Sequence, residues 1–195
     1  LEFRRVLFRS PTPEECVADV NAVIARTKIT FTPSAPIALT WKGNDGTNPT
    51  FWDVATTFNW NSGSADRFFG NDSVTFDNTA STFNVVVQGS SASPGNMVFD
   101  NSLANPYTLT GGGIGGGSLT KNGTGTATIS NTLSHSGGIA VNAGVLSLGT
   151  ANTNTFTGGI NIAGGELQFG GASLVGALNA QPVTMTGGTL ARIAT

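Results

Sequence analysis

The chain has 195 residues, a net charge of −2, 10% charged residues and 27 glycines. This charge gives no basic surface for nucleic acid, and no apolar run reaches the eighteen residues of a membrane-spanning helix. The single cysteine, Cys16, excludes an internal disulfide, so cysteine usage leaves the cellular compartment open.

The first ten residues, LEFRRVLFRS, resemble one reading frame of a sequencing adapter, which is a DNA reagent, and we set them aside as an artefact. The alternative, a basic amphipathic arm, rests only on Arg4, Arg5 and Arg9. Without these ten residues, the native start and any signal peptide would be missing. The other end, TLARIAT, stops inside a strand-like pattern. We therefore expect an internal fragment of a longer protein.

Residues 11–37 are predicted to form a short N-terminal helix, over 12–26, and a linker. Thr12 is a candidate N-cap, Pro13 suits the first helical position and Glu15 completes a capping box. This segment either caps the open end of a β-structure or was joined to the chain by an assembly error, and both alternatives stay open. Whether it belongs to the native protein is not decided by the sequence.

From residue 38 onward, short strands with alternating apolar residues follow one another. They are expected at 38–41, 52–53, 59–60, 68–69, 74–78, 84–87, 97–101 and 107–110. The stretches 74–78 and 97–101 both contain Val-x-Phe-Asp-Asn or a close variant, 23 residues apart. These two copies indicate a repeat.

The repeat is clearest where GGIAVNAGVLSLG at 137–149 returns as GGINIAGGELQFG at 158–170, after 21 residues. Extending this pattern aligns six apolar positions at separations of 20 to 23 residues: Val74, Met97, Leu119, Ile139, Ile160 and Val183. A period near twenty residues, made of strand, glycine turn and strand, is typical of a solenoid whose copies bury their apolar faces on one another.

The sequence therefore predicts an all-β fold, a right-handed parallel β-helix (β-solenoid) of about six coils with a short N-terminal helix. In-register stacking would place Ile139 over Ile160, and would place Gly144 over Gly165 at corners with positive φ. A sandwich does not repeat with residue-level identity. A leucine-rich repeat would need an L-x-x-L-x-L motif, which is not present.

Two stretches, LTKNGTGTATIS at 119–130 and NTFTGGINIAGGEL at 154–167, resemble the autotransporter passenger-associated β-strand repeat. The first NTFTGG-like step departs from the family pattern, because Ser-His-Ser stands there. The resemblance covers about 39–192, with Trp-rich first coils at 38–110 and repeats at 111–195 that are truncated at the C-terminus. It implies an exported, cell-surface β-helical passenger and no particular chemistry.

No cofactor and no metal site is predicted. The glycine run at 111–116 matches G-x-G-x-x-G but lacks the strand–turn–helix unit of a dinucleotide site. Gly117 stands where a calcium-binding nonapeptide needs aspartate. His135, the only histidine, has no carboxylate near it in the sequence, and we expect it in a surface loop or turn.

A mixture of tryptophans and aspartates suggests a carbohydrate site, because flat rings stack on sugars and carboxylates hold hydroxyl groups. The candidate glycan-binding residues are Trp41, Trp52, Trp60 and Asp53, with Asp66, Asp72 and Asp77 nearby in the sequence. The favoured alternative is structural. In that alternative the tryptophans fill a thin core and the aspartates form Asx turns.

Asp77 and Asp100 form a second constellation, because each lies in a Phe-Asp-Asn sequence. Stacking of coils would bring the two carboxylates near one another. We expect them to cap backbone N–H groups at a corner, with a bound cation as the lesser alternative.

The sequence favours a structural and adhesive passenger or stalk module of a bacterial cell surface, associated with the outer membrane and without intrinsic catalysis. Its partners would be surface glycans or other cell-surface polymers and the remainder of the passenger chain, and not nucleic acid. The alternative is a β-helical carbohydrate-active enzyme or a glycan-binding module. Such enzymes gather charged groups on one face, whereas 118–195 contains only Lys121, Glu166 and Arg192.

Overall fold

The computed structural model describes residues 35–149, 154–155, 157–170 and 181–193. By its contacts Pro36–Thr195 forms a unit of its own, and the fold below is that of this unit. The helix expected at 12–26 lies outside the described residues.

Strands, joined by turns and loops, make up the regular structure of the described residues, in which no helix occurs. The strands are β1 (Ala38–Trp41), β2 (Phe51–Trp52), β3 (Trp60–Asn61), β4 (Ala65–Asp66), β5 (Ser73–Phe76), β6 (Asn84–Ala92), β7 (Asn96–Phe99), β8 (Tyr107–Gly116), β9 (Ser118–Lys121), β10 (Thr126–Ile129), β11 (Leu133–His135), β12 (Ile139–Val141), β13 (Val145–Leu148), β14 (Ile160–Ile162), β15 (Glu166–Phe169), β16 (Val183–Met185) and β17 (Thr189–Arg192).

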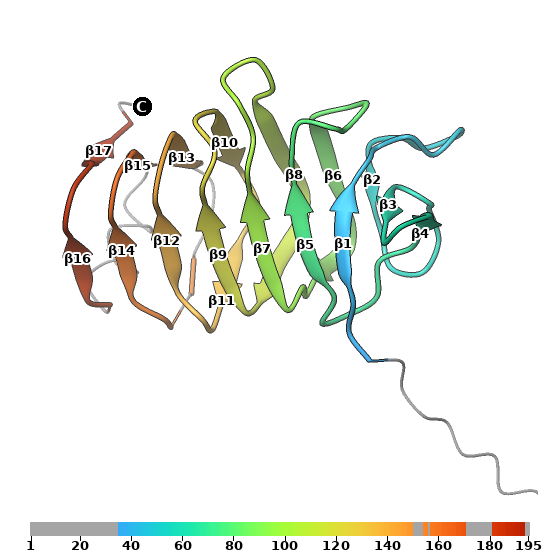
Figure 1. Cartoon of the computed structure of the whole chain (residues 1–195). Helices are drawn as coiled ribbons and strands as arrows, with labels where there is room; N and C mark the ends of the chain where they lie inside the picture. Colours follow the sequence, from blue (N-terminus) through green and yellow to red (C-terminus); the bar gives the residue numbers. More distant parts are fainter. Residues whose placement is uncertain (1–34, 150–153, 156, 171–180, 194–195) are drawn as a thin grey trace, which may run out of the picture. The chain divides into compact units, whose positions relative to one another are not determined.

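Two long sheets form the walls of the fold (Figure 1). One sheet has the order β16-β14-β12-β9-β7-β5-β1-β3-β4, and the other has the order β17-β15-β13-β10-β8-β6-β2, with β11 paired to β8. From β5 onward the chain passes back and forth between the two sheets, and the strands in these two orders pair in parallel with their counterparts one coil later. The described residues therefore form an all-β parallel β-solenoid.

The predicted register is confirmed at all six aligned positions. Each pairs with the next in the order Val74, Met97, Leu119, Ile139, Ile160 and Val183. Five of the six side chains are buried, whereas Val183 is 38% exposed because β16 is the last strand of this sheet in the described residues. The six aligned positions are separated by five turns of the solenoid, so the expected number of about six coils is not confirmed.

Glycine corners make the short period possible. Gly144 and Gly165 have φ of 64° and 69°, as predicted, and a Cβ atom on Gly144 would lie 2.4 Å from the carbonyl oxygens of Gly123 and Gly125. A side chain would therefore collide with the coil below as well as strain the backbone. Between the corners, inward and outward residues alternate, and the inward ones form the core.

The first coil is less regular than the sequence predicts. β3 and β4 form an antiparallel hairpin beside β1, although parallel pairing was expected throughout. Residues 68–69 do not form a strand, although Phe68 is buried in the core and its neighbour Phe69 is 51% exposed. The glycine run at 111–116 is the second half of β8, bent at Gly111 with a φ of 93°.

Candidate functional site

The three tryptophans fill the core of the first coils. Trp41 and Trp52 are 0% exposed and Trp60 is 1% exposed. The centroid of the Trp60 ring lies 5.0 Å from that of Trp41 and 5.3 Å from that of Trp52, in edge-on contacts. Phe68 and Phe76 complete the cluster. Because no indole face is open, these rings offer a sugar nothing to stack on, and their placement supports the core-filling alternative.

Asp53, the fourth candidate glycan-binding residue, is used within its own turn. One of its carboxylate oxygens accepts hydrogen bonds from the backbone N–H of Thr57 at 2.9 Å and of Thr56 at 3.3 Å. It also accepts one from the Thr57 hydroxyl at 3.2 Å. The structure therefore places Asp53 in an Asx-type turn and does not combine it with an exposed ring.

The other aspartates of this region also hold backbone groups. The buried Asp72 carboxylate accepts from the N–H groups of Ile37 at 2.9 Å and Phe69 at 2.8 Å, which ties the start of β1 to a later loop. Asp66 accepts from the Ser62 hydroxyl at 2.6 Å and from the backbone N–H of Arg67 at 2.8 Å. These two bonds hold the pKa of Asp66 below its usual value.

Asp45 is a capping residue that the sequence analysis missed. Its carboxylate accepts from the backbone N–H groups of Asn48 and Thr47, both at 3.0 Å, and of Phe58 at 3.1 Å. These bonds hold the pKa of Asp45 below its usual value. The Asn-Asp-Gly-Thr sequence around it is a turn signal that could have identified this role.

The expectation for His135 is wrong. The residue lies in β11 and is 1% exposed, because it faces inward on the same side of the strand as Leu133. Neither ring nitrogen has a hydrogen-bond partner among the described residues. Burial lowers the pKa of His135 to about 4, and the Gly117 backbone acts in the opposite direction.

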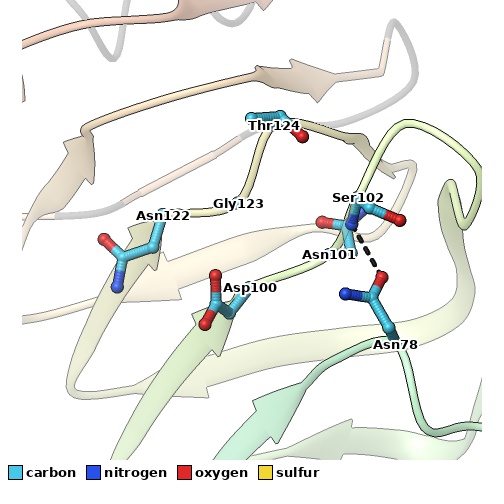
Figure 2. Close-up of a pocket in the computed structure, with 7 residues that line it drawn as sticks. All are labelled: Asn78, Asp100, Asn101, Ser102, Asn122, Gly123 and Thr124. Carbon is cyan, nitrogen blue, oxygen red and sulfur yellow. Dashed lines mark hydrogen bonds between the residues drawn. The ribbon is translucent and has the colours of Figure 1, made fainter.

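A polar pocket of about 330 Å³ lies at the corner that follows β5, β7 and β9. Figure 2 shows its lining, which consists of Asn78, Asp100, Asn101, Ser102, Asn122, Gly123 and Thr124. These residues come from three consecutive coils. The pairing of Phe76 with Phe99 and of Phe99 with Lys121 sets their stacking.

Two asparagine amides of the pocket are oriented by hydrogen bonds across coils. The Asn78 Oδ1 accepts from the backbone N–H of Ser102 at 2.8 Å and from the Asn105 amide at 3.0 Å. The Asn122 Oδ1 accepts from the Asn142 amide at 2.8 Å. Because the Oδ1 atom of each amide accepts these bonds, the NH₂ group of each amide points away from them.

Asp77 and Asp100 occupy equivalent positions on consecutive coils but have different partners. Asp77 caps its corner as expected, accepting from the backbone N–H of Thr79 at 2.8 Å and from its hydroxyl at 2.5 Å. The Asp100 carboxylate is exposed and makes no hydrogen bond with the residues that the structure describes. The capping prediction is therefore confirmed for Asp77 and wrong for Asp100.

The floor of the pocket is buried and closely packed. Asn101 is fully buried and its amide donates to the carbonyl oxygens of Asn105 at 2.8 Å and Thr126 at 3.0 Å. Its own side-chain oxygen has no hydrogen-bond partner. Gly123 packs so closely on Asn101 that a Cβ atom would lie 2.2 Å from the Asn101 carbonyl oxygen. Only glycine fits at this contact.

A buried amine lies under the same corner. Lys121 is 0% exposed and its Nζ donates to the carbonyl oxygen of Gly123. Burial lowers the pKa of Lys121 to about 8, and the negative charge of Asp100 opposes this shift. Among the described ranges, no group of three or more His, Cys, Asp or Glu side chains is arranged to hold a metal ion.

Comparison with known proteins finds one family. Residues 119–148 and 146–169 match the model of the passenger-associated-transport-repeat. No curated protein and no solved structure matches the chain. No helix in the described part of the chain has the length and apolar character to cross a membrane. The segment 119–169, which comprises the coils from β9 to β15, is therefore similar to passenger-associated transport repeats, and this similarity favours a secreted or cell-surface passenger module.

Proposed function

We propose that the chain is a structural and adhesive module of an autotransporter-like passenger, held at the bacterial outer membrane and without catalysis of its own. One observation carries this proposal. The strand register that begins at Leu39 and Val74, ahead of the family repeats, continues without a break into Leu119 and Ile139 within them. The Trp-rich coils and the repeats therefore form one continuous stack.

Such a stack suits a stalk. Each coil adds roughly 4.8 Å along the axis, and its backbone hydrogen bonds run between coils. The load on a stalk of this kind is shared by many bonds in parallel at each coil boundary. Stability is then approximately a sum over coils and their contacts, which suits a spacer of variable length.

The placement of charged groups supports a binding role over a catalytic one. Acid–base catalysis requires titratable groups within hydrogen-bond reach of one another and of the substrate. In the repeats, Lys121 is buried and turned to a backbone carbonyl, while Glu166 accepts from the Gln168 amide at 2.9 Å. Surface glycans or other cell-surface polymers are the partners that we propose, together with the remainder of the passenger.

Surface display tests this proposal. The 195-residue chain would replace the passenger of an autotransporter in a Gram-negative bacterium, and protease added to intact cells would report its exposure. We expect display of the parent chain and reduced display of a Gly144→Val, Gly165→Val variant, which cannot stack. Retention of the parent chain inside the cell would contradict the passenger role. Release of reducing sugars by the purified chain would contradict the absence of catalysis.

A further inference from the structure

We propose that the corner pocket between β5, β7 and β9 binds one neutral sugar residue of a surface glycan through neighbouring hydroxyl groups. This inference rests on the adhesive role proposed above and names a site for it. The site is separate from the buried tryptophans. It uses Asp100, Asn78 and Asn122, whose side chains line the pocket (Figure 2).

The hydrogen-bonding pattern of the pocket matches a sugar. In Figure 2 the Asp100 carboxylate lies between the side chains of Asn78 and Asn122. The carboxylate can only accept, and it has no partner in the described residues. Both asparagine oxygens are engaged with neighbouring coils, so their NH₂ groups are free to donate. A sugar hydroxyl donates and accepts at the same time, so it can satisfy a carboxylate and an amide together.

The same pattern disfavours charged ligands. A metal ion would need oxygen ligands, whereas the two amides present N–H donors, and the Lys121 ammonium lies beneath the corner. An anion would be repelled by the exposed Asp100 carboxylate. A neutral ligand with several hydroxyl groups avoids both conflicts.

The pocket is also preorganised. Asn78 is fixed by two hydrogen bonds across the corner, and Gly123 is fixed by its contact with Asn101. A volume of about 330 Å³ is at the low end of the range of small-molecule pockets, about 300–1,000 Å³. It therefore suits a single ring. Leu103, which follows Ser102, is 77% exposed and adds an apolar group at the same loop.

One shallow site with few contacts binds weakly, so affinity in the millimolar range is expected for a single sugar. Display of many passengers on one cell would convert this weak contact into adhesion, because each further contact becomes intramolecular. The proposal therefore requires weak, saturable binding of neutral sugars and does not require a tight lectin-like site.

Nuclear magnetic resonance titration of the isotope-labelled 195-residue chain tests the site. The probes are the methyl glycosides of glucose, galactose and mannose, methyl glucuronide as the acidic counterpart, and calcium chloride. We expect at least one neutral glycoside to shift the side-chain NH₂ signals of Asn78 and Asn122 and the backbone N–H of Gly123, in a saturable manner. The glucuronide and calcium should shift them less.

One variant tests the role of Asp100, and a second variant is its matched control. Asp100→Asn keeps the size of the side chain and removes the charged acceptor, so the dissociation constant should rise about tenfold. Glu166→Gln removes one carboxylate from a distant coil and should leave binding unchanged. The amide spectrum verifies that each variant keeps the fold.

Four results would overturn the proposal: no shift of these signals at tens of millimolar glycoside, a stronger response to calcium, a stronger response to the glucuronide, or equal affinities of Asp100→Asn and the parent chain. If sugar binding fails while surface display succeeds, this inference is wrong and the passenger role stands. If display fails, the passenger role is contradicted whatever the titration shows.

Discussion

Lys121 pairs with Phe99 on neighbouring strands β9 and β7, so a core position that holds an aromatic ring in one coil holds a primary amine in the next. Val141 follows at the equivalent position of β12. The amine is tolerated because it donates to the carbonyl of Gly123, at the open corner. The charged form still loses hydration, and this lowers the pKa of Lys121 to about 8.

Because of this shift, we expect stability to rise with pH above 8. Between pH 8 and the ordinary lysine value of 10.5, the unfolded chain binds a proton that the folded chain does not, so the free energy of unfolding increases with pH. The increase should be about 2 kcal/mol between pH 8 and pH ~10, because each pH unit over which only the unfolded chain keeps the proton contributes about 1.4 kcal/mol. Denaturant unfolding at a series of pH values measures it.

Lys121→Met is the control for this prediction, because a methionine fills the space of the lysine stem without a titratable group. The variant should show no rise in the same pH range. Measurements should stop near pH 10, since burial also raises the pKa of Tyr107 and its ionisation in the unfolded chain then acts in the opposite direction. An identical rise in parent and variant would assign the effect to another group.

His135 gives the chain an acid sensitivity of its own. Its pKa is about 4 in the folded chain, against an ordinary value of 6.5. As pH falls from 6.5 towards 4, the unfolded chain takes up a proton that the buried ring does not, so stability decreases. The loss should approach about 3 kcal/mol at pH ~4. Unfolding measured across this range reports it.

His135→Leu isolates this effect, because the leucine fills the same inward position and does not titrate. Its stability should change little between pH 6.5 and 4. The aspartates with lowered pKa values, Asp45 and Asp66, add most of their own losses below their ordinary value of 3.8. Parallel curves for the parent and His135→Leu would contradict the prediction.

The corner glycines provide a test of the stacking itself. Gly144→Ala and Gly165→Ala should each lower the free energy of unfolding by about 1 kcal/mol or more, because the backbone has positive φ and the new Cβ would meet the coil below. Gly70→Ala is the matched control, since Gly70 has no positive φ and no atom within 4 Å of the added Cβ. Equal effects at all three positions would refute the stacking argument.

The register of the solenoid could be predicted because the same residue types recur at the same spacing. Leu146 pairs with Leu167 and Leu148 with Phe169, as the copies indicate. The first coil could not be predicted in this way, because the hairpin of β3 and β4 has no counterpart in the described residues of the later coils. A pattern that occurs once gives no period to measure.

The corner pocket could not be predicted because its geometry depends on contacts between coils. The sequence identifies Asp100 as a candidate, but the amide orientations of Asn78 and Asn122 are set by Asn105 and Asn142. The burial of His135, in contrast, had a usable signal. Leu133 and His135 are two residues apart and therefore share one face of a strand.

The burial of the tryptophans makes them probes of folding. All three are buried, so their fluorescence should be blue-shifted in the folded chain and weakly quenched by acrylamide, with strong quenching only after unfolding. Trp52→Ala should lower the free energy of unfolding by about 3–5 kcal/mol through the cavity it leaves. Trp52→Phe should lower it by less than about 1.5 kcal/mol, because it keeps an aromatic ring and removes an indole N–H without a hydrogen-bond partner.

Trp52→Phe also separates the core role of this ring from a ligand-binding role. If the ring only fills the core, the variant should bind the neutral methyl glycosides as the parent chain does, because the corner pocket is intact. If the ring held a sugar, the folded parent would show ready acrylamide quenching, and the glycosides would protect it. Ready quenching of the folded parent chain, or its protection by the glycosides, would indicate that the tryptophans bind the sugar. Loss of glycoside binding in a folded Trp52→Phe chain would indicate the same.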